Sequence, residues 1–289
     1  MKAGVIGLGA MGSGLAANLA RSGQLAAVWN RTREKAEAFA GEHGVALADE
    51  PATVATAADV TFISVDADAD LLEVLDALVD ALEPGKVVVD TSTVAPDTAR
   101  LAAERIAPSG AVFLDAPVSG GPEGARQGTM VMMVGGDTAV LERIHPVLEP
   151  ICGAAHAMGP VGAGQATKAV NQIMVAGIMQ GVASALAYGK GQGLDLQQVI
   201  EVLGAGAASN WQLLQRGPNM VEDRFPPGFR LALHRKDLGI VRDVLAAQGI
   251  ELDLIERTLA DYDRLIEQGH GDEDISALYR LRRGDLGTD

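Results

Sequence analysis

The chain is poor in cysteine, in positive charge and in aromatic residues, and the first two shortages exclude classes of protein. Its one cysteine, Cys152, excludes an intrachain disulfide and fits a reducing compartment, where we interpret it as a small core residue. Lys and Arg number 23 against 38 Asp and Glu, for a net charge of -15. Nucleic-acid binding needs clustered cations to contact phosphates. We therefore expect no nucleic-acid partner.

The sequence also lacks an obvious membrane or export signal. No unbroken apolar run reaches the roughly 18 residues that a membrane span needs, which predicts no membrane partner. Met1 and Lys2 lead directly into an apolar run, so we expect no signal peptide and a cytoplasmic protein. What the chain does have is length and apolar content. With 289 residues, 48% of them hydrophobic, it can bury two domain cores.

The first half of the chain alternates short β-branched runs with helical stretches. The expected strands cover residues 3–6, 25–29, 60–64, 86–89, 112–114 and 130–134. Runs that are apolar on both faces are typical of a parallel sheet covered by helices, and their alternation with helices indicates βαβ units. We predict an α/β fold in which residues 1–160 form a Rossmann domain with a doubly wound parallel sheet.

The strand signal stops after residue 160. Apolar residues then recur at helical spacing from about 164 to 191, which predicts one long helix, and further helices are expected over 195–203, 233–247, 252–268 and 274–282. Residues 161–289 are therefore predicted to form an all-helical domain for substrate binding and dimerisation. Because the long helix is apolar on more than one side, we expect it to be buried in a homodimer or homotetramer.

A glycine-rich segment lies between the first expected strand and the first expected helix. Its residues are Gly7, Leu8, Gly9, Ala10, Met11 and Gly12. In this pattern the first glycine permits a tight turn, the second lets the backbone approach a pyrophosphate, and the third lets the helix pack on the strand. The helix N-terminus offers free N–H groups to the phosphates. A purely structural glycine turn is the alternative, but the position between strand and helix favours a dinucleotide site.

The residues that follow the second strand predict which nicotinamide cofactor binds. Proteins that bind NAD usually place an acid here to hold the ribose 2′-hydroxyl, whereas this chain has Asn30, Arg31 and Thr32. Arg31 can pair with a 2′-phosphate, and the other two can donate hydrogen bonds. The alternative is that Arg31 and Arg33 simply begin a solvated helix, but cations are disfavoured at a helix N-terminus. We therefore predict NADP, with NAD possible.

Three further segments, residues 90–93, 115–121 and 162–172, lie where they could meet the nicotinamide, and none suggests a metal. Ser119, Gly120 and Gly121 follow the strand at 112–114, and ligands of open α/β sheets bind beyond the carboxyl ends of strands. Their hydroxyl and backbone N–H groups suit a carboxylate, although an ordinary glycine turn would look the same. Lys168 and Asn171 share a helix face with Gln172. Spacing alone leaves open whether Lys168 faces solvent or a substrate.

Four segments together resemble the β-hydroxyacid dehydrogenases, in the family's order and across essentially the whole chain. They are residues 7–12, 115–121, 162–171 and 236–238. The resemblance implies an NAD(P)-dependent oxidoreductase that interconverts a small hydroxyacid and its semialdehyde or oxo acid. It implies that Lys168 is the catalytic lysine and that Ser119 and Gly120 hold the substrate carboxylate beside Asn171. It also implies dimers or tetramers that form through the helical domain.

The same resemblance places other residues at the cofactor. Thr93 and Lys236 match positions near the nicotinamide, and the segment 29–32 resembles the branch that prefers NADP. Where the family often has Leu-Pro, this chain has Val65 and Asp66, so we place Val65 at the cofactor. Asp66, with Asp68 and Asp70, is interpreted as a solvated helix start.

The resemblance leaves the substrate open. The family usually has paired asparagines where this chain has Asn171 and Gln172, so the second amide's contact is expected to shift. We favour an activity like that of glyoxylate/succinic semialdehyde reductase, with 3-hydroxyisobutyrate dehydrogenase or tartronate semialdehyde reductase as alternatives. Imine reductases are a further alternative, but they generally lack a lysine at the position of Lys168, so its presence counts against them. A non-catalytic nicotinamide-binding protein is the last alternative, and it should have lost that lysine or the loop at Ser119, whereas this chain has both.

Overall fold

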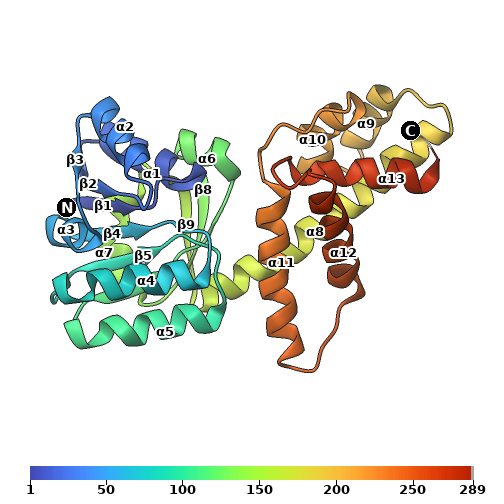
Figure 1. Cartoon of the computed structure of the whole chain (residues 1–289). Coiled ribbons are helices and arrows are strands. Elements are labelled where there is room, and N and C mark those ends of the chain that lie inside the picture. Colours follow the sequence, from blue (N-terminus) through green and yellow to red (C-terminus); the bar gives the residue numbers. More distant parts are fainter. Residues whose placement is uncertain (288–289) are drawn as a thin grey trace. The chain divides into compact units, whose positions relative to one another are not determined.

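The computed structural model describes residues 1–287 and divides the chain into two compact units. Contacts group Met1–Lys168 into the first unit and Ala169–Asp289 into the second. The division falls inside the long helix α8, Ala163–Gly191, whereas the sequence placed a boundary between residues 160 and 161. Both units are drawn in Figure 1.

The first unit is built on one sheet with strand order β3-β2-β1-β4-β5-β6-β8-β7, and β9 pairs with β8 (Figure 1). The strands are β1 Ala3–Ile6, β2 Leu25–Trp29, β3 Ala46–Leu47, β4 Val60–Ile63, β5 Val87–Asp90, β6 Val112–Asp115, β7 Val118–Ser119, β8 Met130–Gly135 and β9 Cys152–Gly159. From β3 to β6 every pairing is parallel, so the predicted Rossmann sheet is confirmed.

The sheet departs from parallel pairing at one edge. Strand β8 runs antiparallel to β6 and to β7. Only residues 120–129 join β7 to β8, and a parallel crossover needs about a dozen residues or more. Strand β9 was missed because Cys152–Gly159 is rich in Ala and Gly and holds no β-branched residue, although it pairs in parallel with β8.

Helices cover both faces of this sheet. They are α1 Ala10–Arg21, α2 Arg33–His43, α3 Pro51–Ala57, α4 Asp68–Leu78, α5 Pro96–Ile106, α6 Gly121–Gln127 and α7 Thr138–Leu148. Val87 and Val89 of β5 belong to the core on the side of α1, whereas Val88 belongs to the core on the side of α4 and α5. Alternate residues of one strand thus point to opposite faces, and both faces are buried. This explains the continuous apolar runs in the sequence.

The second unit is helical, as predicted. It holds most of α8, then α9 Leu196–Gly204, α10 Trp211–Val221, α11 Leu231–Ala246, α12 Asp253–Glu267 and α13 Leu278–Leu286. Between residues 165 and 285 the only β pairing is an isolated bridge of Arg230 with Asp274. Helix α10 was not predicted, because Gly217 and Pro218 lie inside it and both residues disfavour helix interiors.

Helix α8 bears on the expectation that no segment spans a membrane. By length and composition alone, this 29-residue helix is apolar enough to cross a bilayer. Within the second unit, however, Met179, Ala183 and Leu186 have no exposed surface, and Gln180 donates a hydrogen bond to Asp261 of α12. These contacts make α8 the central core helix of its unit.

Candidate active site

The glycine-rich loop has the geometry of a dinucleotide cradle. Gly7 has φ = +94°, and a Cβ there would lie 2.1 Å from the Ser64 carbonyl oxygen. A Cβ at Gly12 would lie 2.0 Å from the Gly7 oxygen, so neither position accepts a side chain. At Gly9, by contrast, a Cβ would meet nothing within 4 Å. The loop is therefore closely packed at Gly7 and Gly12 and open at Gly9, directly before α1 begins with Ala10. These residues fit a pyrophosphate.

Asn30 ties this loop to the end of β2. The backbone N–H of Leu8 donates to Asn30 Oδ1 at 2.8 Å, and Asn30 Nδ2 donates to the Thr32 carbonyl at 2.9 Å. The side chain that was expected to face a phosphate therefore holds the glycine-rich loop in shape. Thr32 is the N-cap of α2, and its side chain makes no capping hydrogen bond.

The two arginines after β2 have different surroundings. Arg33 pairs with Glu37 and Asp49, as a solvated residue at a helix start would. Arg31 pairs with Asp70 of α4, with Arg31 Nη1 2.6 Å from Asp70 Oδ1. The interpretation of the acidic segment as merely solvated is therefore wrong for Asp70. It is also wrong for Asp68, whose Oδ1 accepts hydrogen bonds from the Ala95 N–H and the Thr98 hydroxyl.

The ends of β4 and β5 are joined to the start of α8. The backbone N–H of Val65 donates to Ser92 Oγ at 2.9 Å. Gln165 Nε2 donates to the Ser92 carbonyl at 2.8 Å, and Val94 N–H donates to Gln165 Oε1 at 3.2 Å. Thr93 is thus held between two anchored neighbours. Sequence reasoning assigned no individual role to Ser92 or Gln165, although both lie inside segments that it singled out.

Asp115 anchors the first turn of α8 to the sheet. Its carboxylate is fully buried and accepts hydrogen bonds from the backbone N–H of Gly162 at 2.8 Å and of Gln165 at 2.9 Å. Burial raises the pKa of Asp115, and these backbone hydrogen bonds act in the opposite direction. Asp115 had no individual role in the sequence analysis. Its position as a charged residue at the end of a buried strand could have identified it from the sequence.

Lys168 is buried beside the predicted carboxylate loop. It is 8% exposed, and its Nζ donates to the Val118 carbonyl at 2.8 Å. Ser119, the next residue, is half-buried, and Gly120 is exposed. The solvent-facing alternative for Lys168 is therefore wrong, since its ammonium group reaches the segment that holds the hydroxyl and N–H groups.

The second unit carries a chain of hydrogen-bonded amides and charges. Asn171 Nδ2 donates to Gln172 Oε1 at 2.8 Å, and Gln172 Nε2 donates to Asp237 Oδ2 at 2.6 Å. Lys236 Nζ lies 2.9 Å from Asp237 Oδ1. Gln172 is only 1% exposed. The residue that departs from the family's paired asparagines thus links α8 to α11, and it connects Asn171 to the partner of Lys236.

His234, two residues before Lys236, is a core residue. It has no exposed surface, and its Nδ1 lies 3.0 Å from the Tyr262 hydroxyl while Nε2 lies 3.3 Å from the Gln172 carbonyl oxygen. Burial, followed by the nearby carboxylates of Asp274 and Asp261, raises the pKa of Tyr262, so this hydroxyl stays protonated. A histidine enclosed in this way is poorly placed to exchange protons with a substrate.

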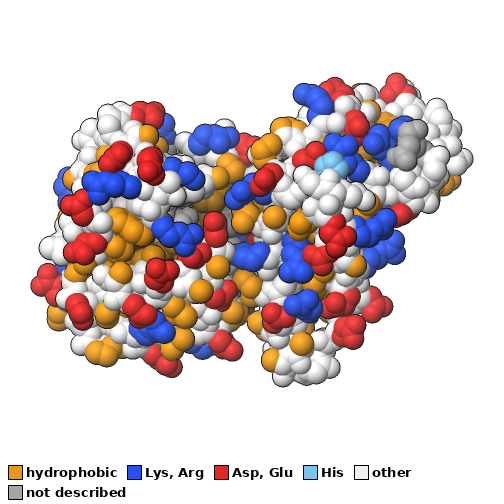
Figure 2. Space-filling view, in the orientation of Figure 1, with side chains coloured by type: hydrophobic (Ala, Val, Ile, Leu, Met, Phe, Trp, Pro, Cys, Tyr) orange, Lys and Arg blue, Asp and Glu red, His pale blue; other side chains and the backbone are white. Residues whose placement is uncertain are grey.

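Charges of both signs share the surface drawn in Figure 2. Basic side chains lie among acidic ones, and many form pairs such as Arg105 with Asp76 and Arg235 with Asp263. The face drawn in Figure 2 therefore offers a cofactor phosphate individual basic residues rather than a broad basic surface. Among residues 1–287 no group of three His, Cys, Asp or Glu side chains is placed to hold a metal ion.

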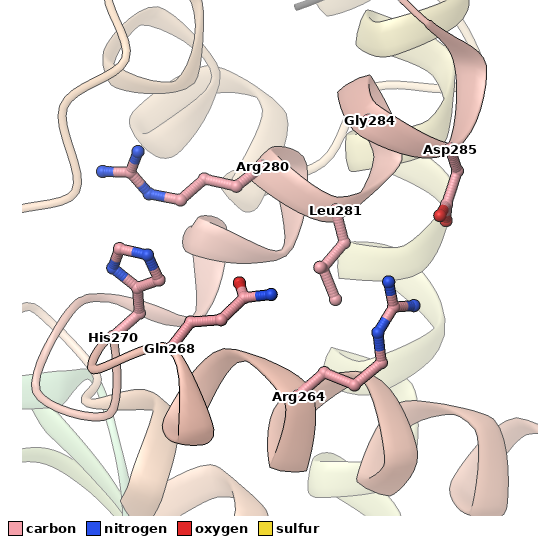
Figure 3. A pocket seen from close by; sticks show the side chains of 7 residues that line it. All are labelled: Arg264, Gln268, His270, Arg280, Leu281, Gly284 and Asp285. Carbon is pink, nitrogen blue, oxygen red and sulfur yellow. The ribbon is translucent and has the colours of Figure 1, made fainter.

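The second unit has a hollow of about 410 Å³ (Figure 3). It is lined by Arg264, Gln268, His270, Arg280, Leu281, Gly284 and Asp285. None of the site residues predicted from the sequence lines it. His270 and Arg280 both pair with Glu273, and Asp285 pairs with Arg282, so its charges are largely matched by neighbours. This hollow therefore does not contain the candidate active site.

Comparison with known families matches nearly the whole chain. Residues 2–159 match the NAD-binding domain of 6-phosphogluconate dehydrogenase. Residues 162–282 match the domain described as NAD-binding of NADP-dependent 3-hydroxyisobutyrate dehydrogenase.

Individual relatives agree with these matches. The 2-hydroxy-3-oxopropionate reductase of Escherichia coli is 36% identical over 96% of both chains. The structure of Mycobacterium tuberculosis 3-hydroxyisobutyrate dehydrogenase with L-serine is 31% identical, with a TM-score of 0.89, and covers 98% of this chain and 99% of its own. A structure described as Psf3 in complex with NADP+ and 2-OPP is 27% identical with a TM-score of 0.88, over 96% and 99% of the two chains. The chain therefore belongs to the β-hydroxyacid dehydrogenase family, whose members are NAD(P)-dependent oxidoreductases of small hydroxyacids.

Proposed function

We propose that this protein reduces a short 2-oxo or 3-oxo acid, or a semialdehyde with a remote carboxylate, to the hydroxyacid. Glyoxylate and succinic semialdehyde are the substrates we favour. The observation that carries the proposal is the 2.8 Å hydrogen bond from Lys168 Nζ to the Val118 carbonyl. It brings a buried ammonium group to the segment Ser119, Gly120 and Gly121, which suits a carboxylate.

For the cofactor we infer a site that residues 1–160 largely form, together with Lys236, and that prefers NADPH over NADH. The loop from Gly7 to Gly12, with Leu8, Ala10 and Met11, would hold the pyrophosphate, and Asn30, Arg31 and Thr32 would lie at the 2′-phosphate. Val65, Thr93 and Lys236 are assigned to the nicotinamide side. When bound, the cofactor supplies the hydride.

The chain's own residues would supply the proton and the orientation. Carbonyl reduction leaves negative charge on the substrate oxygen, and an ammonium group both stabilises that charge and donates a proton. We assign this role to Lys168, whose Nζ is directed by the Val118 carbonyl. The Ser119 hydroxyl, the N–H groups of Gly120 and Gly121, and the Asn171 amide would bind the carboxylate. In the oxidative direction Lys168 would accept the proton.

A matched pair of substrates tests the carboxylate assignment. Succinic semialdehyde and butanal both present a four-carbon aldehyde, but only the first carries a carboxylate. Loss of charge-assisted hydrogen bonds worth ~1.5–3 kcal/mol should lower kcat/KM for butanal by roughly 10- to 100-fold. Oxidation of NADPH is followed by absorbance. Comparable kcat/KM for the two aldehydes would contradict the assignment.

The proposed location and assembly are a cytoplasmic homodimer or homotetramer in which residues 161–289 contribute the interface. Val170, Met174 and Tyr188 of α8 are each at least 60% exposed. No charged residue lies between Lys168 and Lys190, and a Cβ at Gly181 would meet nothing within 4 Å. A second copy of this uncharged face would bury these side chains, and Gly181 permits close approach of a helix. Light scattering should show a dimer or tetramer that Met174→Glu dissociates; a wild-type monomer would refute this.

A further inference from the structure

The side chain expected to recognise the 2′-phosphate already has an anionic partner. Arg31 Nη1 lies 2.6 Å from Asp70 Oδ1. The two residues are 39 positions apart, so the fold, and not local sequence, creates this pair. A guanidinium group that pairs with a carboxylate must give up that contact, wholly or in part, before it can pair with a phosphate.

Asp70 is the more firmly placed of the two partners. Its side chain is 23% exposed, against 71% for Arg31. It belongs to the first turn of α4, where a carboxylate is favoured by the helix dipole. That helix is fixed to the core by Leu71 and Leu75, which have no exposed surface. Arg31 instead lies in the turn before α2, which begins at Arg33. A cofactor would therefore have to draw Arg31 away from a fixed carboxylate.

Other acids reinforce the same field. The hydrogen bond and charge of Asp70, and more weakly the charges of Glu73 and Asp66, raise the pKa of Arg31. A 2′-phosphate brings up to two further negative charges to this cluster. A ribose hydroxyl brings none, and a carboxylate near the ribose is what NAD-binding proteins commonly use to accept its hydrogen bond.

We propose that Asp70 is a specificity-determining residue, whose carboxylate competes with the cofactor 2′-phosphate for Arg31 and so narrows the preference for NADPH over NADH. This inference rests on the proposed role of Arg31 in NADPH binding. It explains why the acidic residues at the start of α4 differ in function: Asp68 fastens α4 to the start of α5, whereas Asp70 tunes the cofactor site.

The test compares cofactor affinities of the full-length protein. Dissociation constants for NADPH and NADH are measured by quenching of tryptophan fluorescence for the wild type, Asp70→Asn, Arg31→Ala and the double variant. Asp76→Asn is the matched control, because Asp76 is an exposed acid on the same helix that pairs with Arg105 and not with Arg31. It removes the same charge from α4 and leaves the Arg31 pair in place.

Releasing Arg31 should tighten NADPH binding. We expect Asp70→Asn to lower the NADPH dissociation constant by about threefold to tenfold, from the lost competing pair and the lost repulsion. NADH affinity should stay the same or weaken, and Asp76→Asn should change neither. In the Arg31→Ala background, Asp70→Asn should tighten NADPH binding clearly less, because only the lost repulsion remains and there is no guanidinium group to release.

The results distinguish failure of this inference from failure of the proposed role of Arg31 in NADPH binding. If Arg31→Ala weakens NADPH and NADH equally, the phosphate-binding role of Arg31 fails. If Arg31→Ala weakens NADPH selectively but Asp70→Asn leaves both affinities unchanged, only the competition by Asp70 is refuted. An equal gain from Asp76→Asn, or a full gain without Arg31, would show a general charge effect and would also refute it.

Discussion

Replacing Asp115 should uncouple the start of α8 from the sheet. Its carboxylate holds the backbone N–H groups of Gly162 and Gln165, and Lys168 lies three residues further along the same helix. In Asp115→Ala both N–H groups lose a buried acceptor. In Asp115→Asn one acceptor oxygen remains, but the amide nitrogen cannot accept from the second N–H.

The magnitude follows from these two hydrogen bonds. Each hydrogen bond to a charged group contributes ~1.5–3 kcal/mol, so the gross loss in Asp115→Ala is ~3–6 kcal/mol. Burial raises the pKa of Asp115, which shows that the charged form is held at a cost, and removing it returns part of the loss. We expect Asp115→Ala to lower the free energy of unfolding by ~2–4 kcal/mol and Asp115→Asn by ~1–3 kcal/mol.

Each unit has one tryptophan, which makes a selective assay possible. Trp29 lies in β2 of the first unit and Trp211 in α10 of the second, and the chain has two tryptophans. In a Trp211→Phe background, urea unfolding followed by fluorescence reports the first unit. In a Trp29→Phe background it reports the second. Asp115→Ala should shift the transition seen by Trp29 more than the one seen by Trp211, and kcat should fall as Lys168 loses its position.

The stability of the wild type relative to Asp115→Asn should depend on pH. Because the pKa of Asp115 is raised, the folded state holds this proton more tightly than the unfolded state does. The wild type should therefore lose stability, relative to Asp115→Asn, as pH rises from the unfolded pKa of ~3.9 through the folded value. An unchanged Trp29 transition in Asp115→Ala, with normal kcat, would refute the anchoring role.

Three smaller predictions concern other residues. Burial raises the pKa of Cys152 to about 11, so this thiol should react slowly with a thiol reagent in the native protein at neutral pH. After denaturation one equivalent of thiol per chain should react; a fast reaction of the native protein would contradict the core position of Cys152. Gln172→Leu leaves a buried Asp237 oxygen without its hydrogen-bond donor. It should lower the free energy of unfolding reported by Trp211 fluorescence by ~1–3 kcal/mol, and an unchanged value would argue against a stabilising hydrogen bond between α8 and α11. The hydrogen bond from Arg235 lowers the pKa of Asp263. This exposed pair should therefore stabilise the folded state by less than ~1 kcal/mol at pH values above the unfolded pKa of Asp263, and this stabilisation should disappear in acid or high salt. A larger loss of stability in Asp263→Asn that does not depend on salt would show a different role.

The parts of the fold that depend on local sequence could be predicted. The loop at Gly7 and Gly12 is dictated by backbone geometry that only glycine satisfies, and the long helix α8 by sustained helical spacing. Strand β9 escaped prediction because its Ala and Gly residues have low strand propensity. Its pairing with β8 comes from the fold rather than from its own side chains.

Candidate site residues could be proposed from the sequence where a residue's chemistry is visible in its own motif, as for Lys168 and Ser119. They could not be proposed where a role depends on a distant partner. Gln172 and Asp237 are 65 positions apart, and Asp115 lies 50 positions from Gln165. Such contacts need the tertiary structure, because spacing along one helix or strand carries no information about them.

The most direct test of the account is the rate of Lys168→Ala. If Lys168 donates the proton, kcat for succinic semialdehyde reduction should fall by ~10²–10⁴, the usual contribution of a general acid. NADPH affinity should persist, because the glycine loop and Arg31 are untouched, and Lys236→Ala should retain more activity than Lys168→Ala. A near-normal kcat in Lys168→Ala, with Lys236→Ala inactive, would contradict the assignment and transfer the role to Lys236.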